Sequence, residues 1–263
     1  MQDFSKEYRQ RYHRQIIVKE IGEKGQRKLD RARVLVVGTG GLGSPVALYL
    51  AAAGIGTIGL VDDDRVEISN LQRQLLHSVD ELGNKKVASA RRRLKKLNPD
   101  LEVEIHSSRL ERDNALETIE DYHLVVNAVD NFATRYLVND ACVLTKTPLV
   151  EAGIMGFDGQ LISVIPGQGP CYRCLFPEAP SGNTLEQEIG VLGAVPGVIG
   201  SLQALEAIKI ILDQGRPLVG RLLIFEGLQL TFQEIEIERD GDCAVCGENP
   251  TITDLRDNPS SHD

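Results

Sequence analysis

The sequence predicts an α/β fold of the doubly wound, Rossmann-like type, with a parallel core and an antiparallel extension near the C-terminus. Three observations predict it. Short apolar segments alternate with helical ones from Arg33 to Gly153, a glycine-rich turn follows the first apolar segment, and two strand-like segments follow one another late in the chain. Such alternation implies a mostly parallel sheet with helices on both faces, and the 263 residues fit one large domain of this kind.

The first half of the chain alternates regularly. Phe4–Arg31 is rich in charge, with apolar residues at helical spacing, so we expect short helices outside the sheet. The segments expected as strands are Val34–Gly38, Thr57–Asp62, Leu101–His106, His123–Asp130 and Pro148–Gly153. The segments expected as helices between them are Leu42–Ala53, Val79–Leu97, Asn114–Glu120 and Phe132–Thr145.

The alternation ends after Gly153. A strand is expected at Gly159–Pro166, before a stretch rich in Gly, Pro and Cys that runs to Gly182. A long apolar helix is expected at Pro196–Leu212, and strands at Arg221–Glu226 and Leu230–Glu238. The alternating pattern of the last two strands indicates an antiparallel extension of the sheet.

Charge and cysteine content exclude several classes of protein. With 29 basic and 38 acidic residues the net charge is −9, which argues against nucleic acid as the main partner. The N-terminus lacks the apolar segment of a secretory signal, so we expect a cytoplasmic protein. An odd number of cysteines, five, in a reducing compartment argues against a disulfide framework. The uncharged segment Val34–Val61 is long enough for a membrane span, but its glycines and Pro45 indicate a buried βαβ unit instead.

A glycine motif provides the first functional indication. Gly38, Gly40 and Gly43 form G-x-G-x-x-G between a strand and a helix, and Asp62 ends the next strand about 20 residues further on. Glycines let the backbone approach phosphates, the helix N-terminus supplies donors, and the acid binds ribose hydroxyls. A turn needed only for close helix packing is the structural alternative. Taken alone, the motif would also suit a nicotinamide-dependent oxidoreductase.

Polar residues after Asp62 favour a polyphosphate instead of a dinucleotide. Amide, hydroxyl and guanidinium groups lie close together in the segment Ser69, Asn70, Leu71, Gln72, Arg73 and Gln74, and Lys86 follows. Arg and Lys beside a glycine-rich turn form a clamp for phosphates, although each alone could be a solvated surface residue. Asp130, followed by Asn131, ends a strand where doubly wound sheets bind ligands, and its carboxylate suits Mg²⁺ next to a triphosphate.

Four of the five cysteines form two C-x-x-C pairs, Cys171 with Cys174 and Cys243 with Cys246. Four thiolates fit a tetrahedral Zn²⁺ ion with no open position, which predicts a structural zinc site. Two redox pairs are the alternative, but neither pair is expected at the start of a helix after a βαβ strand. Cys142, within an apolar helical segment, is expected to be a buried small hydrophobic residue.

These motifs together resemble the MoeB, ThiF and HesA family of ubiquitin-activating-enzyme-like adenylyltransferases, over nearly the whole chain. The resemblance rests on the glycine motif, Lys86, the two Cys pairs and four sequence segments, Arg11–Gln15, Asn70–Gln74, Asp130–Arg135 and Gly197–Ala204. It implies ATP-dependent adenylation of the C-terminal glycine of a small ubiquitin-like sulfur-carrier protein ending in Gly-Gly. The products would be the carrier acyl-adenylate and pyrophosphate.

The resemblance also implies roles for individual residues. Gly41 and its neighbours would contact the phosphates and Asp62 the ribose. Asn70, Arg73 and Lys86 would hold the triphosphate, and Asp130 would bind Mg²⁺. Arg14 in such enzymes reaches the phosphates bound by the neighbouring subunit, which implies a homodimer. A non-catalytic partner subunit would not need Arg14, Arg73, Lys86 and Asp130, so their presence argues against that alternative.

We therefore expect a single adenylation domain over residues 1–250, followed by a disordered tail at 251–263. Its parts would be N-terminal helices at 4–31, a nucleotide-binding α/β core at 33–153, and a zinc and crossover-loop region at 154–250. Related enzymes often carry a loop cysteine where this chain has Leu185–Glu188. Without it, we expect a separate sulfur donor to take over the acyl-adenylate. The sequence leaves open which carrier and which pathway (thiamin, molybdopterin, tRNA thiolation or amino-acid synthesis) the protein serves.

Overall fold

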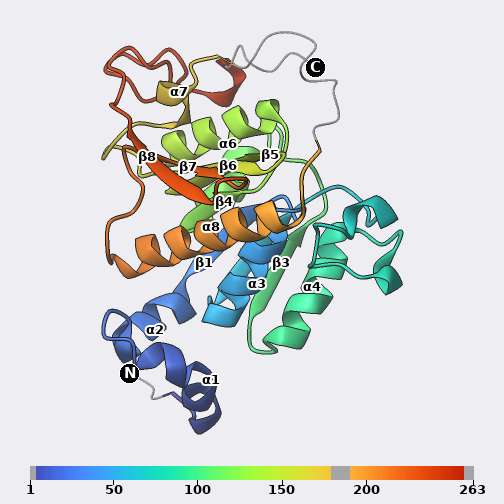
Figure 1. Ribbon diagram of the computed structural model, residues 1–263. Coiled ribbons are helices and arrows are strands. Elements are labelled where there is room, and N and C mark those ends of the chain that lie inside the picture. The colour runs from blue at the N-terminus through green and yellow to red at the C-terminus, as the bar shows by residue number, and fades with distance from the viewer. Residues whose placement is uncertain (1–3, 179–189, 258–263) are drawn as a thin grey trace.

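The computed structural model describes residues 4–178 and 190–257, and they form an eight-stranded sheet with helices on both faces (Figure 1). The strand order is β3-β2-β1-β4-β5-β6-β7-β8. The strands are β1 (Arg33–Val37), β2 (Thr57–Val61), β3 (Glu102–His106), β4 (Leu124–Asn127), β5 (Leu149–Met155), β6 (Asp158–Val164), β7 (Arg221–Glu226) and β8 (Thr231–Glu236). The first five are parallel, and β6 to β8 continue the sheet antiparallel, which confirms the predicted fold class.

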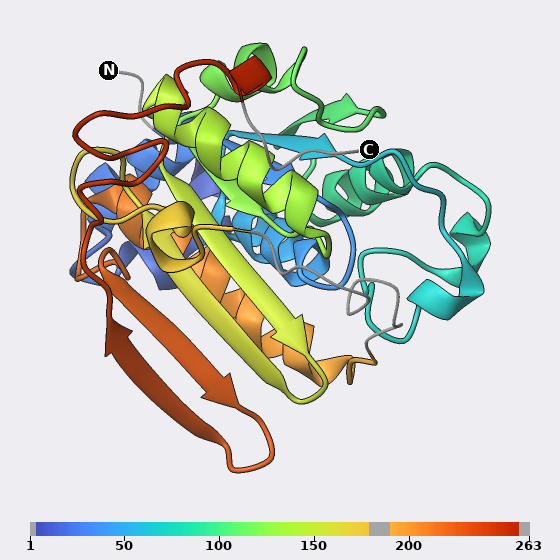
Figure 2. The same ribbon diagram turned by 90° about the horizontal axis from the view of Figure 1, so that it is seen from above.

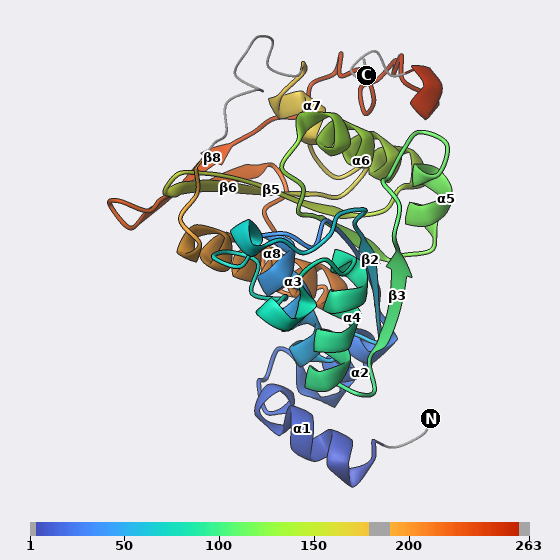
Figure 3. The same cartoon turned by 90° about the vertical axis from the view of Figure 1, so that its right-hand side faces the viewer.

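Helices cover the parallel part of the sheet on both faces (Figure 3). On one face α3, α4 and α8 pack against the strands, and on the other face α5 and α6 do so. Helices α1 and α2 lie beyond the lower end of the sheet in Figure 1. Their bounds are α1 (Lys6–Ile16), α2 (Gly22–Arg31), α3 (Gly43–Ala53), α4 (Lys86–Leu97), α5 (Ala115–Glu120), α6 (Phe132–Thr145), α7 (Tyr172–Leu175) and α8 (Ala194–Leu212).

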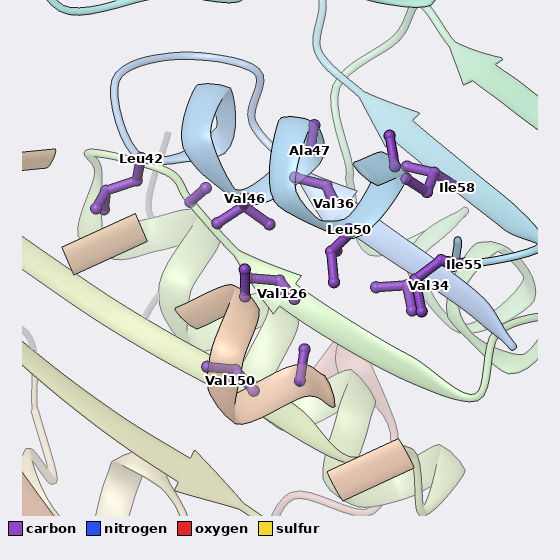
Figure 4. Packing of buried hydrophobic residues seen from close by; sticks show 14 of the residues in the cluster. Val34, Val36, Leu42, Val46, Ala47, Leu50, Ile55, Ile58, Val126 and Val150 are labelled. Carbon is purple, nitrogen blue, oxygen red and sulfur yellow. The ribbon is translucent and has the colours of Figure 1, made fainter. Parts of the chain in front are cut away.

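Buried aliphatic side chains hold α3 against the sheet. In Figure 4, Val46 and Leu50 of α3 lie over Val34 and Val36 of β1 and Val126 of β4, and all five are fully buried. Burying such side chains contributes about 1.5–3 kcal/mol each relative to exposing them. This packing fixes the start of α3 above the carboxyl ends of β1 and β4, where the strand order reverses and doubly wound sheets bind ligands.

Helix α8 is mostly apolar, with Ser201, Gln203, Glu206 and Lys209 as its polar residues. By length and composition it could cross a membrane, but half of its apolar window is buried against β4, β5, β6 and α3. A helix packed on a sheet on one side and on another helix needs apolar residues on most of its surface. The apolar composition of α8 is therefore explained by its place in the core. It begins at Ala194, slightly before the expected start at Pro196.

The expected helix Val79–Leu97 was wrong in its first part. Residues Val79–Glu81 form a single 3₁₀ turn, Gly83 adopts a positive φ of 79°, and α4 begins only at Lys86. A left-handed glycine ends helical geometry, because the residues on either side cannot share one helix axis. The break places Lys86 in the first turn of α4.

The expected disordered tail begins too early at residue 251. Ile252 and Leu255 are buried, and they pack in the cluster that α5 and α6 form with the sheet. The chain is therefore held by apolar contacts as far as the turn Leu255–Asp257. The rest of the expected tail, residues 258–263, lies outside the described residues.

Candidate functional site

The turn Gly38–Gly43, called the glycine turn below, brings β1, β4 and the start of α3 into close contact. Gly38 has a φ of 91°, and a Cβ there would lie 2.8 Å from the carbonyl oxygen of Ala128. A Cβ on Gly43 would lie 2.0 Å from the carbonyl oxygen of Gly38. No side chain caps the N-terminus of α3. The Ser44 N–H donates to the Gly40 carbonyl oxygen at 3.0 Å and Pro45 has no N–H, so the backbone N–H groups of residues 41–43 are the ones available to an anion.

Asp62 is tied to this turn by hydrogen bonds. One oxygen of its carboxylate accepts from the backbone N–H and from the hydroxyl of Thr39, each at 2.8 Å. The other oxygen accepts from the backbone N–H of Asp64 at 2.9 Å. The carboxylate is therefore held at the end of β2, beside the glycine turn. It is half-buried, so a ribose could reach it from solvent.

The segment Ser69–Gln74 lies against the glycine turn. The Cγ of Arg73 would be 3.5 Å from a Cβ on Gly41, and Gln74 lies beside Gly40. The guanidinium of Arg73 donates to the carbonyl oxygen of Ser69 at 3.0 Å and is half-exposed. Gln74 is 4% exposed, and its Oε1 has no partner among the described residues.

Other side chains of this segment have structural roles. The Asn70 amide oxygen accepts from the backbone N–H of Glu67 at 3.1 Å, in a reciprocal cap of the short 3₁₀ turn Ile68–Asn70. Gln72 packs against the start of α8: a Cβ on Gly193 would lie 2.1 Å from the backbone carbonyl oxygen of Gln72. Ser69 and Gln72 are exposed and Leu71 is half-buried.

Lys86 lies at the base of the site. Its Nζ is 2.8 Å from a carboxylate oxygen of Asp64, and its side chain is 8% exposed against 63% for Asp64. Backbone hydrogen bonds between the two segments, such as Lys86 N–H to the Asp64 carbonyl at 2.9 Å, fix the start of α4. Sequence reasoning missed Asp64, although its position two residues after Asp62 could have indicated it.

The end of β4 supplies Asp130 and Asn131. Asp130 is exposed, and none of the described residues pairs with its carboxylate, so it is free to bind a cation. The Asn131 side chain caps α6 by accepting from the backbone N–H of Thr134 at 2.9 Å. Its amide nitrogen is the part left for a ligand.

A buried polar network supports this strand end from behind. Arg135 donates to Glu151 at 2.8 Å and to the carbonyl oxygen of Val129 at 3.1 Å, directly before Asp130. Asn127 donates to the same carboxylate at 2.6 Å. Burial raises the pKa of Glu151 to about 7, and Arg135 and the hydrogen bond from Asn127 oppose the rise. Arg135 was expected only as the end of the segment Asp130–Arg135, and its pairing with Glu151 was not predicted, because it joins elements far apart in the sequence.

Arg14 does not lie with the other predicted residues in one chain. It belongs to the last turn of α1, and its neighbour Gln15 donates to the carbonyl oxygen of Ala53 at the far end of α3 from the glycine turn. The 11 residues of α3 place its end at Ala53, where Gln15 binds, about 16 Å from its start at the glycine turn. Thus the chain brings together the glycine turn, Asp62, the segment Ser69–Gln74, Lys86 and Asp130, but not Arg14.

The four paired cysteines converge beside α6, near Asn139 and Asp140 in its middle. Cys171 and Cys243 have sulfur atoms 3.6 Å apart, those of Cys174 and Cys246 are 3.4 Å apart, and all four lie within 4.8 Å of one another. A disulfide would need about 2.05 Å. Four sulfurs at about 2.3 Å from a tetrahedral zinc would be about 3.8 Å apart, so the cluster fits this ion.

The cysteine cluster is anchored on α6 by buried polar contacts. Cys171 precedes the single turn α7, whose Tyr172 N–H donates to the side chain of Asn139 at 2.9 Å. Arg173 forms two hydrogen bonds with Asp140, at 2.7 and 2.8 Å. Both side chains are buried, and each charge would be costly to bury without the other. This ion pair therefore holds the segment of Cys171 and Cys174 against α6.

Cys142 is unsuited to nucleophilic chemistry. It lies on α6, is fully buried in the apolar core, and burial raises the pKa of its thiol well above the usual value. A nucleophilic cysteine needs an accessible thiolate. The prediction of a buried, small hydrophobic residue at this position is confirmed. The expected loop segment Leu185–Glu188 lies outside the described residues.

Comparisons with known proteins agree with this arrangement. Residues 12–245 match the ThiF family. The "Adenylyltransferase and sulfurtransferase MOCS3" of Aedes aegypti is 55% identical over 250 residues, which are 94% of this chain but 57% of that protein. The "Sulfur carrier protein adenylyltransferase" of Thermus thermophilus is 48% identical over 261 residues, covering 97% of this chain and 96% of that protein.

Solved structures of E. coli MccB have the same fold. The crystal structure with MccA-N7isoASN gives a TM-score of 0.82 at 27% identity, over 90% of this chain and 75% of that chain. The crystal structure of MccB with ATP gives 0.77 at 28% identity, over 84% and 68% of the two chains.

The geometry of the cysteine cluster predicts a metal-dependent stability. Native protein should contain about one zinc per chain, and Cys174→Ser or prolonged chelation should lower the free energy of unfolding strongly, because metal binding at such a site contributes folding energy. Elemental analysis and urea unfolding measure the two quantities. Cys142→Ala is the control and should keep its zinc. Protein that lacks metal and is equally stable with Ser at position 174 would favour redox pairs instead.

Proposed function

The chain belongs to the ThiF family, and on this basis we propose that it adenylates the C-terminal glycine of a small ubiquitin-like sulfur-carrier protein ending in Gly-Gly. The observation that carries the proposal is the position of Arg73 against the uncapped, glycine-lined helix N-terminus, with Lys86 paired to Asp64 beside Asp62, which is bonded to the same turn. The name of the Thermus relative, which this chain covers almost completely, supports it. The proposed domain is a single adenylation unit that includes the buried residues Ile252 and Leu255, beyond the expected boundary at residue 250.

The proposed reaction needs positioning and charge neutralisation more than a protein nucleophile. A carboxylate oxygen of the carrier attacks the α-phosphorus of ATP, the bond from that phosphorus to the bridging oxygen breaks, and pyrophosphate leaves. Asn70, Arg73 and Lys86 hold the triphosphate, Gly41 and its neighbours contact phosphates, and Asp62 binds the ribose. Preorganised cations stabilise the charge that develops on the leaving group.

Lys86 is already paired in the structure, and this pairing supports the proposed role. Asp64 neutralises the Lys86 ammonium, but Asp64 itself is mostly exposed. A triphosphate carries more negative charge and accepts hydrogen bonds from several oxygens, so it can take over the ammonium at little desolvation cost. The side chain would then exchange one anionic partner for another without changing its buried surroundings.

Asp130 is the residue proposed to hold Mg²⁺. Mg²⁺ prefers one or two carboxylates together with phosphate oxygens, and the exposed carboxylate of Asp130 fits this preference because no described side chain competes for it. When bound, the ion would neutralise charge on the phosphates. Arg135 would hold the backbone before Asp130 in place through its bond to Val129.

The two alternatives explain less of the site. A nicotinamide-dependent oxidoreductase would use the glycine turn and Asp62 but has no use for Arg73 and Lys86 beside them. A non-catalytic partner subunit would not need a complete phosphate clamp. Protection against heat by ATP but not by NAD would separate the first alternative from the adenylyltransferase.

A homodimer would complete the proposed site. Arg14 lies about the length of α3 away from the glycine turn of its own chain, so it could act only on the site of a neighbouring subunit. Exposed apolar side chains on the face that carries α3 and α8, Tyr49 at 56% and Leu205 at 52%, provide surface for such a contact. Association of two copies would bury them.

The remaining partners follow from the chemistry of the cysteines. Four cysteines without disulfides suit a structural zinc ion in the reducing cytoplasm, where we place the protein. Cys142 is buried, so the described residues offer no accessible thiol outside the cluster. The acyl-adenylate would therefore pass to a separate sulfur donor. Neither nucleic acid nor a membrane is proposed as a partner.

The clamp residues should affect catalysis much more than folding. Replacing Arg73 or Lys86 with Ala should slow carrier-dependent exchange of pyrophosphate into ATP by about 10²- to 10³-fold, the usual cost of one preorganised charge contact. The melting temperature should hardly change, since Arg73 is half-exposed and the partner of Lys86 is solvated. Lys96→Ala, an exposed position on the same helix α4, is the control and should keep full activity. Unchanged exchange in both clamp variants would contradict the proposal.

If Arg14 acts on the neighbouring subunit, two different defects should complement each other. Chains with Arg14→Ala and chains with Asp130→Ala should each be inactive, whereas a mixed dimer should contain one intact site because each defect lies in a different half of it. Activity of re-associated mixtures, with dimers verified by native mass spectrometry, measures this. Mixed dimers without activity would show that Arg14 does not act across the interface.

A further inference from the structure

A buried histidine joins the parts of the candidate site that come from different segments. His77 is 8% exposed, and its imidazole makes two hydrogen bonds, from Nε2 to the carbonyl oxygen of Thr39 at 3.1 Å and between Nδ1 and the hydroxyl of Ser89 at 2.9 Å. Thr39 belongs to the glycine turn, and Ser89 lies one helical turn after Lys86 on α4. The proposed function above gives His77 no role.

The two hydrogen bonds define the protonation state of the ring. A carbonyl oxygen can only accept, so Nε2 carries the proton, and Nδ1 accepts from the Ser89 hydroxyl. Burial lowers the pKa of His77, and the nearby Lys86 lowers it further, while the bond to Thr39 and the carboxylates of Asp62 and Glu81 oppose the change. The imidazole is therefore neutral and adds no charge to the phosphate site.

Thr39 extends this connection to the ribose side of the site. Its backbone N–H and hydroxyl both donate to Asp62 at 2.8 Å, while its carbonyl accepts from His77. The segment that carries Arg73 is attached to the same turn by a second bond, from the backbone N–H of Leu76 to the hydroxyl of Ser44 on α3 at 3.3 Å. The bonds of His77 and of Ser44 are buried, so they strongly restrict the relative position of the elements they join.

We infer that His77 is a positioning residue that sets the distance between the glycine turn and the Lys86 end of α4, and with it the geometry of the phosphate clamp. This inference rests on the proposed function, because the clamp must fit a triphosphate. His77 itself touches no substrate. It acts through Thr39 on one side and through Ser89 on the other. Displacements of about 1 Å at such a clamp are enough to slow a reaction on the order of 10²-fold.

Three variants separate positioning from simple packing. His77→Leu keeps a side chain of similar bulk but removes both hydrogen bonds, and His77→Gln keeps a donor at the distance of Nε2. Leu94→Ala, a fully buried residue at the far end of α4, is the matched control, because it loosens the same helix without touching the site. All measurements are made at a temperature where circular dichroism shows every variant folded.

The expected result is a split between catalysis and stability. His77→Leu should lower kcat for carrier-dependent pyrophosphate exchange on the order of 10- to 100-fold, with a smaller rise of the KM for ATP, and His77→Gln should recover most of the loss. Leu94→Ala should lower the melting temperature at least as much while keeping kcat within about twofold. Equal effects of His77→Leu and Leu94→Ala on kcat, or no recovery with Gln, would overturn the inference.

A second measurement does not depend on turnover. Amide hydrogen exchange at Thr39–Gly43 should be faster in His77→Leu than in the unaltered chain, but unchanged in Leu94→Ala, since only the first variant frees the glycine turn. If the unaltered chain catalyses no exchange with any Gly-Gly-ending carrier, the proposed function fails, and this measurement still decides on His77. Equal protection of the turn in all variants would show that His77 does not hold it.

Discussion

The uncapped N-terminus of α3 is the constraint on which the rest of the structure depends. Its amides can meet an anion only because the backbone of Gly43 packs against that of Gly38, and Gly38 against Ala128 after β4. A side chain on either glycine would prevent these contacts. The acid at Asp62, the cations at Arg73 and Lys86, and the carboxylate of Asp130 are then arranged around this point by elements that pack against the same turn.

Local patterns were sufficient to predict the sheet and much of the site. The strand-turn-helix around Gly38–Gly43 and the apolar segments have short-range causes, and the confirmed fold class follows from them. Proximity of the four cysteines also followed from their spacing. The start of α4 was wrong by several residues, because a left-handed glycine at position 83 counts for more than the helical pattern around it.

Contacts between distant segments could not be predicted in this way. The buried group of Arg135, Glu151 and Asn127 draws on α6, β5 and β4, and only the packed sheet brings these residues together. The bond from His77 to Thr39 likewise spans two elements, and nothing in the sequence around His77 indicates a partner. Glu151, Asn127 and His77 hold functional groups in place without having a recognisable motif of their own.

The central claim is that this site activates a carboxylate by adenylation and supplies no nucleophile of its own. The most direct test incubates the protein with Mg-ATP and a purified Gly-Gly-ending carrier and takes intact mass spectra without reductant. The account predicts carrier with one added adenylyl group and no covalent adduct on this chain, since Cys142 is buried. Unmodified carrier alongside newly formed ADP, or a thiol-labile adduct that disappears with Cys142→Ala, would contradict it.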